Sequence, residues 1–405
     1  MNTTERFLKY VTIDTTSNPE SESFPSSAKQ FDLLNLLCRE LSELGLSEVK
    51  IDEYGYVSAC LKSNTTAKVP TLAFIAHVDT SPEVSGTNVK PQITHYTGGE
   101  LKINDTLSIA ESRLKDYIGD NIITSDGTTL LGADDKAGVA EIMSAMEFLV
   151  NNPDVAHGDI KVLFTPDEEI GKGVDFMDIA ALRADYGYTV DGGECGSLEW
   201  ETFNAAAATV TFKGINFHPG YAKGAMINAQ VVALEFQNIM PQEQTPERTE
   251  LREGFFHLTH SEGSVESCTL NYIIRDHDSK KFEQRKELMR QLTEQINAKW
   301  GENLVEICIK DQYYNMGEVI KNHFICVEIA EKAMKSLGIE PKISAIRGGT
   351  DGSRLSFMGL PCPNIFTGAE NIHSRLEFVS ERVMSLSVKT VIKIVDFFYQ
   401  KSLEV

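Results

Sequence analysis

Residues 71–80 read TLAFIAHVDT, an apolar run of strand length that ends in a histidine and an aspartate. Two further apolar runs, IKVLFTP at 160–166 and YGYTV at 186–190, are also followed by acidic residues. Residues 28–45 and 136–150 have the apolar periodicity of helices and stand before and between these runs. Because strands alternate with helices, we predict a three-layer α/β domain with a largely parallel sheet.

The middle of the chain has a different order of elements. We expect, in sequence order, a strand at 205–214, a helix at 224–240, two strands within 254–276, a helix at 279–300 and a strand at 303–311. This β-α-β-β-α-β order is typical of a small ferredoxin-like α+β domain. The chain of 405 residues is also longer than one hydrophobic core usually serves. We therefore predict a main α/β domain made of residues 1–205 and 312–405, with an inserted domain at 206–311.

The composition is that of a globular protein, with 41% hydrophobic and 24% charged residues. A formal net charge of −21 disfavours nucleic acid as a partner, because phosphate-binding proteins need basic patches. No apolar run approaches the roughly 20 residues that span a bilayer, and the N-terminal residues are polar. We therefore expect no membrane binding and a cytoplasmic location, where the seven scattered cysteines would stay reduced.

Five short features of the chain contain residues that can bind metal. They are His77 with Asp79, Asp134 in GADDK, Glu168 and Glu169 in TPDEE, Asp191 in DGG, and His373 in NIHSR. Each feature has a simpler interpretation when it is taken alone. An acidic pair before a helix is a common N-cap, a run of acids can be a solvated turn, and a lone histidine is usually structural.

Taken together, the five features indicate a metal centre. Four of them follow strand-like segments of one predicted sheet, where α/β proteins place their ligands, and the fifth begins a helix. Histidines mixed with carboxylates are typical of catalytic zinc. The charges also balance, because two Zn²⁺ ions would be neutralised by Asp134, Glu169, Asp191 and a bridging hydroxide.

Longer blocks of the sequence resemble a known family. These blocks include TTLLGADDKAG at 128–138, FTPDEEIGKG at 164–173 and IRGGTDGS at 346–353. With the order His-x-Asp, Asp, Glu-Glu, Asp, His, the chain is similar over nearly its whole length to the dinuclear zinc exopeptidases, which include glutamate carboxypeptidases and aminoacylases. The resemblance implies a three-layer zinc-exopeptidase-like catalytic domain with an inserted α+β ferredoxin-like lid domain. In this family the lid often mediates formation of a homodimer.

The resemblance also implies which residues bind metal. One zinc ion would be held by His77 and Asp191, the other by Glu169 and His373, and Asp134 would bridge both. One departure from the pattern is visible, because similar enzymes often carry a second histidine where Leu376 stands.

Three further residues would take part in catalysis according to the resemblance. Glu168 would be the catalytic base, and Asp79 would orient the ring of His77. His218 in FHPG matches a lid histidine that reaches an active site, commonly that of the partner subunit. Without the resemblance, His218 would be interpreted as a turn residue before Pro219.

Within the family, the blocks are most similar to those of tripeptide aminopeptidases. We therefore expect a metalloaminopeptidase that releases the N-terminal residue from tripeptides by attack of a dizinc-bound hydroxide, with Mn²⁺ or Co²⁺ as substitutes for zinc. Arg275 and Arg347 would bind the C-terminal carboxylate of the peptide, or else form structural salt bridges. The alternatives are an N-acyl amino acid deacylase or carboxypeptidase on the same scaffold, and a catalytically inactive binding homologue.

Overall fold

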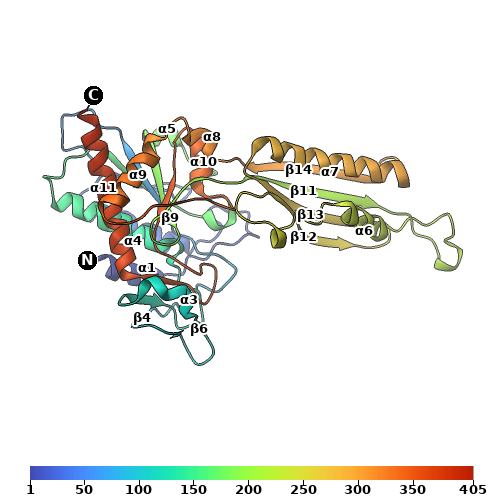
Figure 1. Cartoon of the computed structure of the whole chain (residues 1–405), viewed down its shortest axis with the longest axis horizontal. Coiled ribbons are helices and arrows are strands. Elements are labelled where there is room, and N and C mark those ends of the chain that lie inside the picture. Colours follow the sequence, from blue (N-terminus) through green and yellow to red (C-terminus); the bar gives the residue numbers. More distant parts are fainter. Residues whose placement is uncertain (405) are drawn as a thin grey trace. The chain divides into compact units, whose positions relative to one another are not determined.

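The computed structural model describes residues 1–404, which divide into two compact units. Unit 1 comprises the described residues 1–200, 318–344 and 350–404, and unit 2 comprises residues 201–317 and 345–349. The chain therefore leaves unit 1 and returns to it, as Figure 1 shows by the colours of its two ends.

An eight-stranded mixed sheet forms the centre of unit 1, in the order β1-β2-β8-β3-β9-β16-β10-β15. Its strands are β1 (Ser47–Ile51), β2 (Val57–Leu61), β3 (Leu72–His77), β8 (Ile160–Thr165), β9 (Tyr186–Gly192), β10 (Ser197–Glu201), β15 (Lys342–Ala345) and β16 (Asn364–Phe366). The middle strands β8, β3, β9 and β16 run parallel to one another, whereas β2 and β10 pair antiparallel with β8 and β16. Every residue of β3 and β8 is buried, which explains why both strands are mostly apolar.

Unit 1 also contains helices. They are α1 (Thr3–Val11), α2 (Gln30–Glu43), α3 (Glu111–Leu114), α4 (Ala133–Asn151), α5 (Ile179–Leu182), α8 (Gly317–Ile320), α9 (Ile325–Ser336), α10 (Asp351–Phe357) and α11 (Glu381–Ser402). Of these helices, α2, α4 and α10 contact the central sheet directly. Two small sheets complete unit 1, with strands β4 (Gln92–His95), β7 (Asn121–Thr124) and β17 (Phe378–Ser380) in one and β5 (Leu101–Lys102) and β6 (Ser108–Ile109) in the other.

Helix α4 packs between the sheet and the helices α1 and α11, and most of its residues are buried. Gly138 permits its close approach to the sheet. A Cβ atom at Gly138 would lie 1.8 Å from the carbonyl oxygen of Val190 in β9, so no other residue fits there without displacing the helix. This contact brings the start of α4 beside the carboxyl ends of β3 and β9.

Unit 2 is a four-stranded antiparallel sheet in the order β12-β13-β11-β14, with two helices. Along the chain its elements are β11 (Asn204–Lys213), α6 (Ala229–Ile239), β12 (Phe255–Gly263), β13 (Ser267–Asp276), α7 (Ser279–Trp300) and β14 (Val305–Tyr313). Residues of β13 alternate between buried and less buried positions, and a core formed with α6 and α7 covers the buried side. The predicted fold class, an α/β domain with an inserted ferredoxin-like domain, is confirmed.

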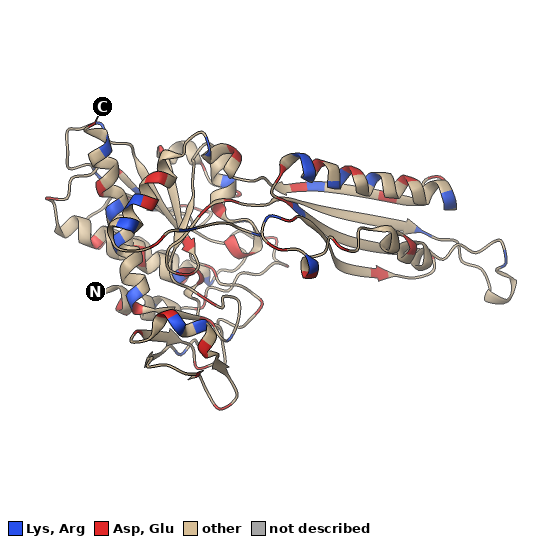
Figure 2. Ribbon diagram, viewed as in Figure 1, with Lys and Arg blue, Asp and Glu red and all other residues tan. Residues whose placement is uncertain are grey.

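Among residues 1–404, none of the helices combines the length and the apolar composition that a membrane-spanning segment requires. Acidic and basic side chains are interspersed on the helices of both units (Figure 2). Short single-turn 3-10 helices occur in several loops, at Lys115–Tyr117, Glu168–Ile170, Pro219–Tyr221 and Pro246–Arg248. The second of these contains two of the predicted site residues.

Candidate metal centre

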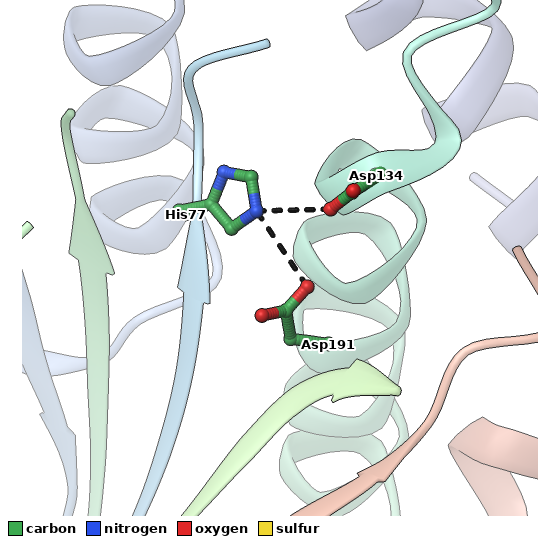
Figure 3. A group of neighbouring side chains, drawn as sticks. All are labelled: His77, Asp134 and Asp191. Atoms are coloured by element: carbon green, nitrogen blue, oxygen red, sulfur yellow. Dashed lines mark hydrogen bonds and ion pairs between the residues drawn. The ribbon is translucent and has the colours of Figure 1, made fainter. Parts of the chain in front are cut away.

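Three of the predicted ligands meet where the central sheet of unit 1 ends. His77 is the last residue of β3, Asp191 lies near the end of β9, and Asp134 lies at the start of α4 (Figure 3). The Nε2 atom of His77 is 3.0 Å from Oδ1 of Asp134 and 3.5 Å from Oδ1 of Asp191. These three side chains offer ligand atoms close enough together to hold one metal ion.

A second group of ligands shares Asp134 with the first. The Nε2 atom of His373 lies 3.2 Å from Oδ2 of Asp134 and 2.8 Å from Oε2 of Glu169. Asp134 therefore presents Oδ1 to one group and Oδ2 to the other. The structure thus brings all five predicted ligands together as two groups of three that have one carboxylate in common.

The histidine nitrogens show why a cation fits the first group. A neutral imidazole carries one N–H and one lone pair. Both nitrogens of His77 face oxygen, however, because Nδ1 lies 3.0 Å from the carbonyl oxygen of Asp79 and Nε2 lies between two carboxylates. If the Nδ1–H group donates to Asp79, the lone pair of Nε2 faces the carboxylate oxygens. These atoms repel one another unless a cation lies between them.

The pKa values of the clustered side chains also indicate a site for cations. Burial raises the pKa of Glu169 to about 8 and that of Asp191 to about 7. Hydrogen bonds with Asp134 and Glu169 raise the pKa of His373 to about 11. The Oε1 atom of Glu169 is buried and has no hydrogen-bond partner. Without metal, this cluster takes up protons to reduce its negative charge, and divalent cations would serve the same purpose. The residues therefore fit a pair of metal ions.

Asp79 contacts both the ring of His77 and the backbone of Glu168 and Glu169. Its Oδ1 atom lies 3.3 Å from Nδ1 of His77, so carboxylate and carbonyl oxygen together face that nitrogen. The same carboxylate accepts the backbone N–H groups of Glu168 at 3.0 Å and Glu169 at 3.2 Å. Asp79 thus fixes the backbone of the two neighbouring glutamates as well as the histidine ring.

Glu168 is placed differently from Glu169, although the two are adjacent in the sequence. Glu169 lies in a ligand group, whereas Glu168 belongs to neither group. Burial raises the pKa of Glu168 well above its ordinary value. The preceding residue, Asp167, has a φ of 57°, a left-handed conformation that is uncommon outside glycine. Its carboxylate accepts hydrogen bonds from Ser26 and Gln30, which hold this turn in place.

His373 also has a left-handed backbone, with a φ of 57°. Such conformations cost free energy and persist where surrounding contacts impose them, often at functional sites. The Nδ1 atom of His373 lies 3.6 Å from Oε2 of Glu83, within ion-pair distance but too far for a hydrogen bond. Leu376, where similar enzymes often have histidine, is half-buried in the same segment.

Two buried acids near the site had no role in the sequence interpretation. Asp351 accepts a hydrogen bond from the hydroxyl of Thr165 at 2.9 Å, at the end of β8 and level with His77 in β3. Glu377 accepts hydrogen bonds from the backbone N–H groups of Leu131, Gly132 and Asp134. Asp351 stands in the block IRGGTDGS, which could have drawn attention to it, whereas Glu377 follows His373 without any motif of its own.

The other three predicted residues belong to unit 2. His218 is exposed, and its Nδ1 atom accepts the N–H of Gly220 at 3.1 Å. Arg275 donates to the carbonyl oxygens of Ala206 and Ile274, and its guanidinium lies 5.5 Å from the ring centre of Tyr313.

Arg347 is held by more contacts within unit 2 than Arg275. It donates to the carbonyl oxygens of Leu251 at 2.8 Å and Glu253 at 3.0 Å, and to the hydroxyl of Thr249 at 3.0 Å. Its guanidinium also lies 5.2 Å from the ring centre of Phe203. All of these partners are neutral, so they satisfy hydrogen bonds without balancing the positive charge.

Comparison with known proteins agrees with this fold. Residues 200–303 match the family model described as a peptidase dimerisation domain. The structure is similar to the crystal structures of an aminopeptidase PepT from Bacillus cereus (TM-score 0.78) and a tripeptidase from Staphylococcus aureus (TM-score 0.79). Each is 23% identical in sequence, and each alignment covers 98% of both chains. A dinuclear metal-binding peptidase of the M20 family from Bacillus subtilis aligns with a TM-score of 0.69 at 14% identity and covers 98% of this chain and 97% of its own.

The sequence itself is much closer to a group of curated relatives. The chain is 52% identical over 403 residues to Peptidase T of Caldanaerobacter subterraneus subsp. tengcongensis, with 98% of both chains covered. It is 51% identical over 402 residues to Peptidase T of Lysinibacillus sphaericus, again with 98% of both covered. Fold, dimerisation domain and relatives together define the class as a peptidase, and hence a hydrolase, with the M20 architecture. The chain belongs to the peptidase T family, and the resemblance read from its motifs is confirmed.

Proposed function

We propose that this protein is a zinc-dependent aminopeptidase that releases the N-terminal residue from tripeptides. The observation that carries the proposal is the shared carboxylate of Asp134, which faces two ligand groups with different oxygens. The relatives named Peptidase T and the similar structure titled as a tripeptidase support the peptide substrate. They do not favour the deacylase, the carboxypeptidase or the inactive homologue.

The metal pair would be held by the residues of the two groups. His77 and Asp191 would bind one ion, Glu169 and His373 the other, and Asp134 both. Two ions would act as Lewis acids that polarise the scissile carbonyl group and lower the pKa of a water molecule. We propose Zn²⁺ because mixed histidine and carboxylate ligands suit it, with Mn²⁺ or Co²⁺ as substitutes.

Glu168 would move the proton. Glu168 is half-buried beside the ligand groups without belonging to either, so its carboxylate remains free to act as a base. As the oxygen of water bonds to the carbonyl carbon, Glu168 would accept a proton from that water. It would return this proton to the amine nitrogen as the carbon–nitrogen bond breaks. Asp79 would support both steps, because it fixes the backbone of Glu168 and the ring of His77.

His218 would donate a hydrogen bond to the oxyanion. Since its Nδ1 atom accepts the N–H of Gly220, the proton of the neutral ring resides on Nε2. A neutral histidine in this tautomer offers one N–H donor from an exposed position, which is what an oxyanion requires. We propose that unit 2 is a lid that carries this donor, with unit 1 as the catalytic domain, and that lid domains pair in a homodimer.

Arg275 and Arg347 would recognise the C-terminal carboxylate of a short peptide. Arg275 has carbonyl oxygens and an aromatic ring as partners, so its positive charge is available for a carboxylate. The guanidinium of Arg347 makes more hydrogen bonds within unit 2 and would contribute mainly by charge. We propose a cytoplasmic location, where short peptides are degraded.

Hydrolysis of a matched substrate series would test the function. The purified protein, loaded with Zn²⁺, is given a tripeptide, its N-acetylated form, the corresponding tetrapeptide and an N-acetyl amino acid. We expect release of the N-terminal residue from the free tripeptide and little reaction with the other three. Faster hydrolysis of either acetylated compound would identify a deacylase or carboxypeptidase instead. Absence of hydrolysis for the whole series, with two metal ions bound, would indicate a binding homologue.

A further inference from the structure

Glu377 is a buried acid that contacts the backbone of the shared ligand, Asp134, and of the residues just before it. Only 1% of its surface is exposed, and it immediately precedes β17. Its Oε2 atom accepts the N–H groups of Leu131 at 2.7 Å and Gly132 at 2.8 Å. Its Oε1 atom accepts the N–H of Asp134 at 3.0 Å. One side chain therefore satisfies three backbone donors of the segment that leads into α4.

These donors have no ordinary partner within a helix or strand. The first turn of a helix leaves its N–H groups unsatisfied, and a buried N–H without an acceptor is costly. The backbone here is also irregular, because Gly132 has a φ of 82° and Asp134 has non-helical torsions of −85° and 101°. Such a segment lacks the regular backbone hydrogen bonds of a helix or strand. The carboxylate of Glu377 supplies acceptors for its N–H groups instead.

We propose that Glu377 is a positioning residue for the metal centre: it fixes the backbone of Asp134 so that Oδ1 and Oδ2 face the two ligand groups. The inference rests on the proposed function, since it concerns the same metal centre. His373 and Glu377 are four residues apart, so one short segment supplies a ligand of one ion and the support of the ligand that both ions share.

This arrangement has a specific consequence for metal binding. Substitution of a ligand that belongs to one group, such as His77 or His373, mainly lowers the affinity of that group for its metal ion. Displacement of Asp134 lowers the metal affinity of both groups at once. Loss of Glu377 would therefore affect both ions, although Glu377 belongs to neither group. Groups that support metal ligands typically contribute about 10–100-fold to metal affinity. Disruption of these hydrogen bonds should therefore weaken the binding of both metal ions by a factor in this range.

Glu377→Gln is the sharpest test, because it preserves size and removes one acceptor. Both oxygens of Glu377 face N–H donors, so the NH₂ group of glutamine must face a donor in either orientation. Glu370→Gln is the matched control. Glu370 lies in the same segment, where it accepts a hydrogen bond from the hydroxyl of Tyr117, and a glutamine oxygen can keep that bond.

Metal affinity of the full-length protein is measured by competition with a chelator, using Zn²⁺ alone. Unaltered protein and Glu370→Gln should each bind two ions, and the affinity for each ion should be the same in both proteins. Glu377→Gln should bind both ions about 10–100-fold more weakly. Two tight ions in Glu377→Gln would overturn the inference and leave the proposed metal centre intact. Fewer than two ions in the unaltered protein would overturn the proposed function.

Hydrogen exchange in metal-free protein provides a readout that does not depend on metal. Mass spectrometry of the peptide 128–136 should show faster amide exchange in Glu377→Gln than in Glu370→Gln, because at least one of the donors loses its acceptor. Glu377→Asp, which keeps the charge on a shorter side chain, should restore part of the metal affinity. Faster exchange across the whole chain in both Glu377 variants would overturn the positioning role and indicate a general loss of stability.

Discussion

The Nε2 atom of His77 lies 3.0 Å from Oδ1 of Asp134, although 57 positions separate the two residues in the sequence. The contact exists because β3 ends beside the start of α4, which Gly138 allows to approach the sheet closely. The second oxygen of Asp134 faces His373 at 3.2 Å. Asp134 is thus the residue on which both halves of the proposed metal centre depend.

Removal of the shared carboxylate should therefore remove both metal ions. Asp134→Ala is expected to bind less than one ion per chain, whereas His373→Ala should keep the ion held by His77 and Asp191. Elemental analysis of the purified variants measures the difference. A single tightly bound ion in fully active unaltered protein would contradict the dinuclear centre.

The two adjacent glutamates should respond differently to the same substitution. Glu168→Gln should retain two metal ions and lose about 10²–10⁴-fold in kcat, because a general base contributes an effect of this size. Glu169→Gln should lose metal, because Glu169 lies in a ligand group. Metal content and kcat are measured on the same preparations. The opposite pattern, with metal lost from Glu168→Gln alone, would reverse the two assignments.

The stability of the metal-free protein should fall as pH rises from about 5 to 8. Burial raises the pKa of Glu169 from an ordinary value of 4.5 to about 8, so between these values the folded state holds a proton that the unfolded state has lost. The unfolded state then binds fewer protons, and the free energy of unfolding decreases with pH. Thermal unfolding of chelator-treated protein at pH 5, 6.5 and 8 measures the trend.

Saturating Zn²⁺ provides the control for this pH dependence. Metal ions compete with the protons of the site, so the loaded protein should lose much less stability over the same range. An equal pH dependence with and without metal would show that the trend arises elsewhere in the protein.

Arg275→Ala should raise KM for tripeptides and reduce the preference for tripeptides over tetrapeptides. A guanidinium that binds the C-terminal carboxylate measures substrate length, because the terminus of a longer peptide cannot occupy the same place. Arg290→Ala, an exposed arginine of the same unit, is the matched control and should leave both quantities unchanged. The idea fails if Arg275→Ala keeps the KM and the length preference of the unaltered protein.

His218→Ala should lower kcat by about 10²–10³-fold while metal content and folding stay normal, as expected for the loss of one oxyanion donor. His260→Ala, which removes another exposed histidine of unit 2, should have no such effect. Activity recovered on mixing His218→Ala with Glu168→Gln chains would show that His218 acts across a dimer. If His218→Ala keeps the full kcat, His218 has no oxyanion role and is only a turn residue.

Much of the fold follows from local sequence patterns. The buried strands β3 and β8 are mostly apolar, as is typical of parallel strands that are covered on both faces. In unit 2, the predicted helix at 279–300 coincides with α7, and the order of elements identified the ferredoxin-like topology. The helix at 224–240 was predicted too long, because α6 begins at Ala229, with Asn228 as its N-cap.

The order of ligand types along the chain was likewise visible in the sequence. Strand ends that carry histidine or carboxylate indicated a metal centre, and the motifs indicated the family. The sequence did not contain the geometry of that centre. Side chains separated by hundreds of residues meet only when the sheet and α4 have packed, so their distances depend on the tertiary structure.

Glu377 shows the limit of the sequence most clearly. It belongs to none of the five features that indicated the metal centre, and an isolated glutamate is usually a surface residue. Only the folded chain brings its carboxylate to the N–H groups of Leu131, Gly132 and Asp134. The sequence determined which residues could bind metal, because ligand chemistry belongs to residue types. The tertiary structure decided which backbone groups hold them, because a buried N–H must find its acceptor wherever folding places one.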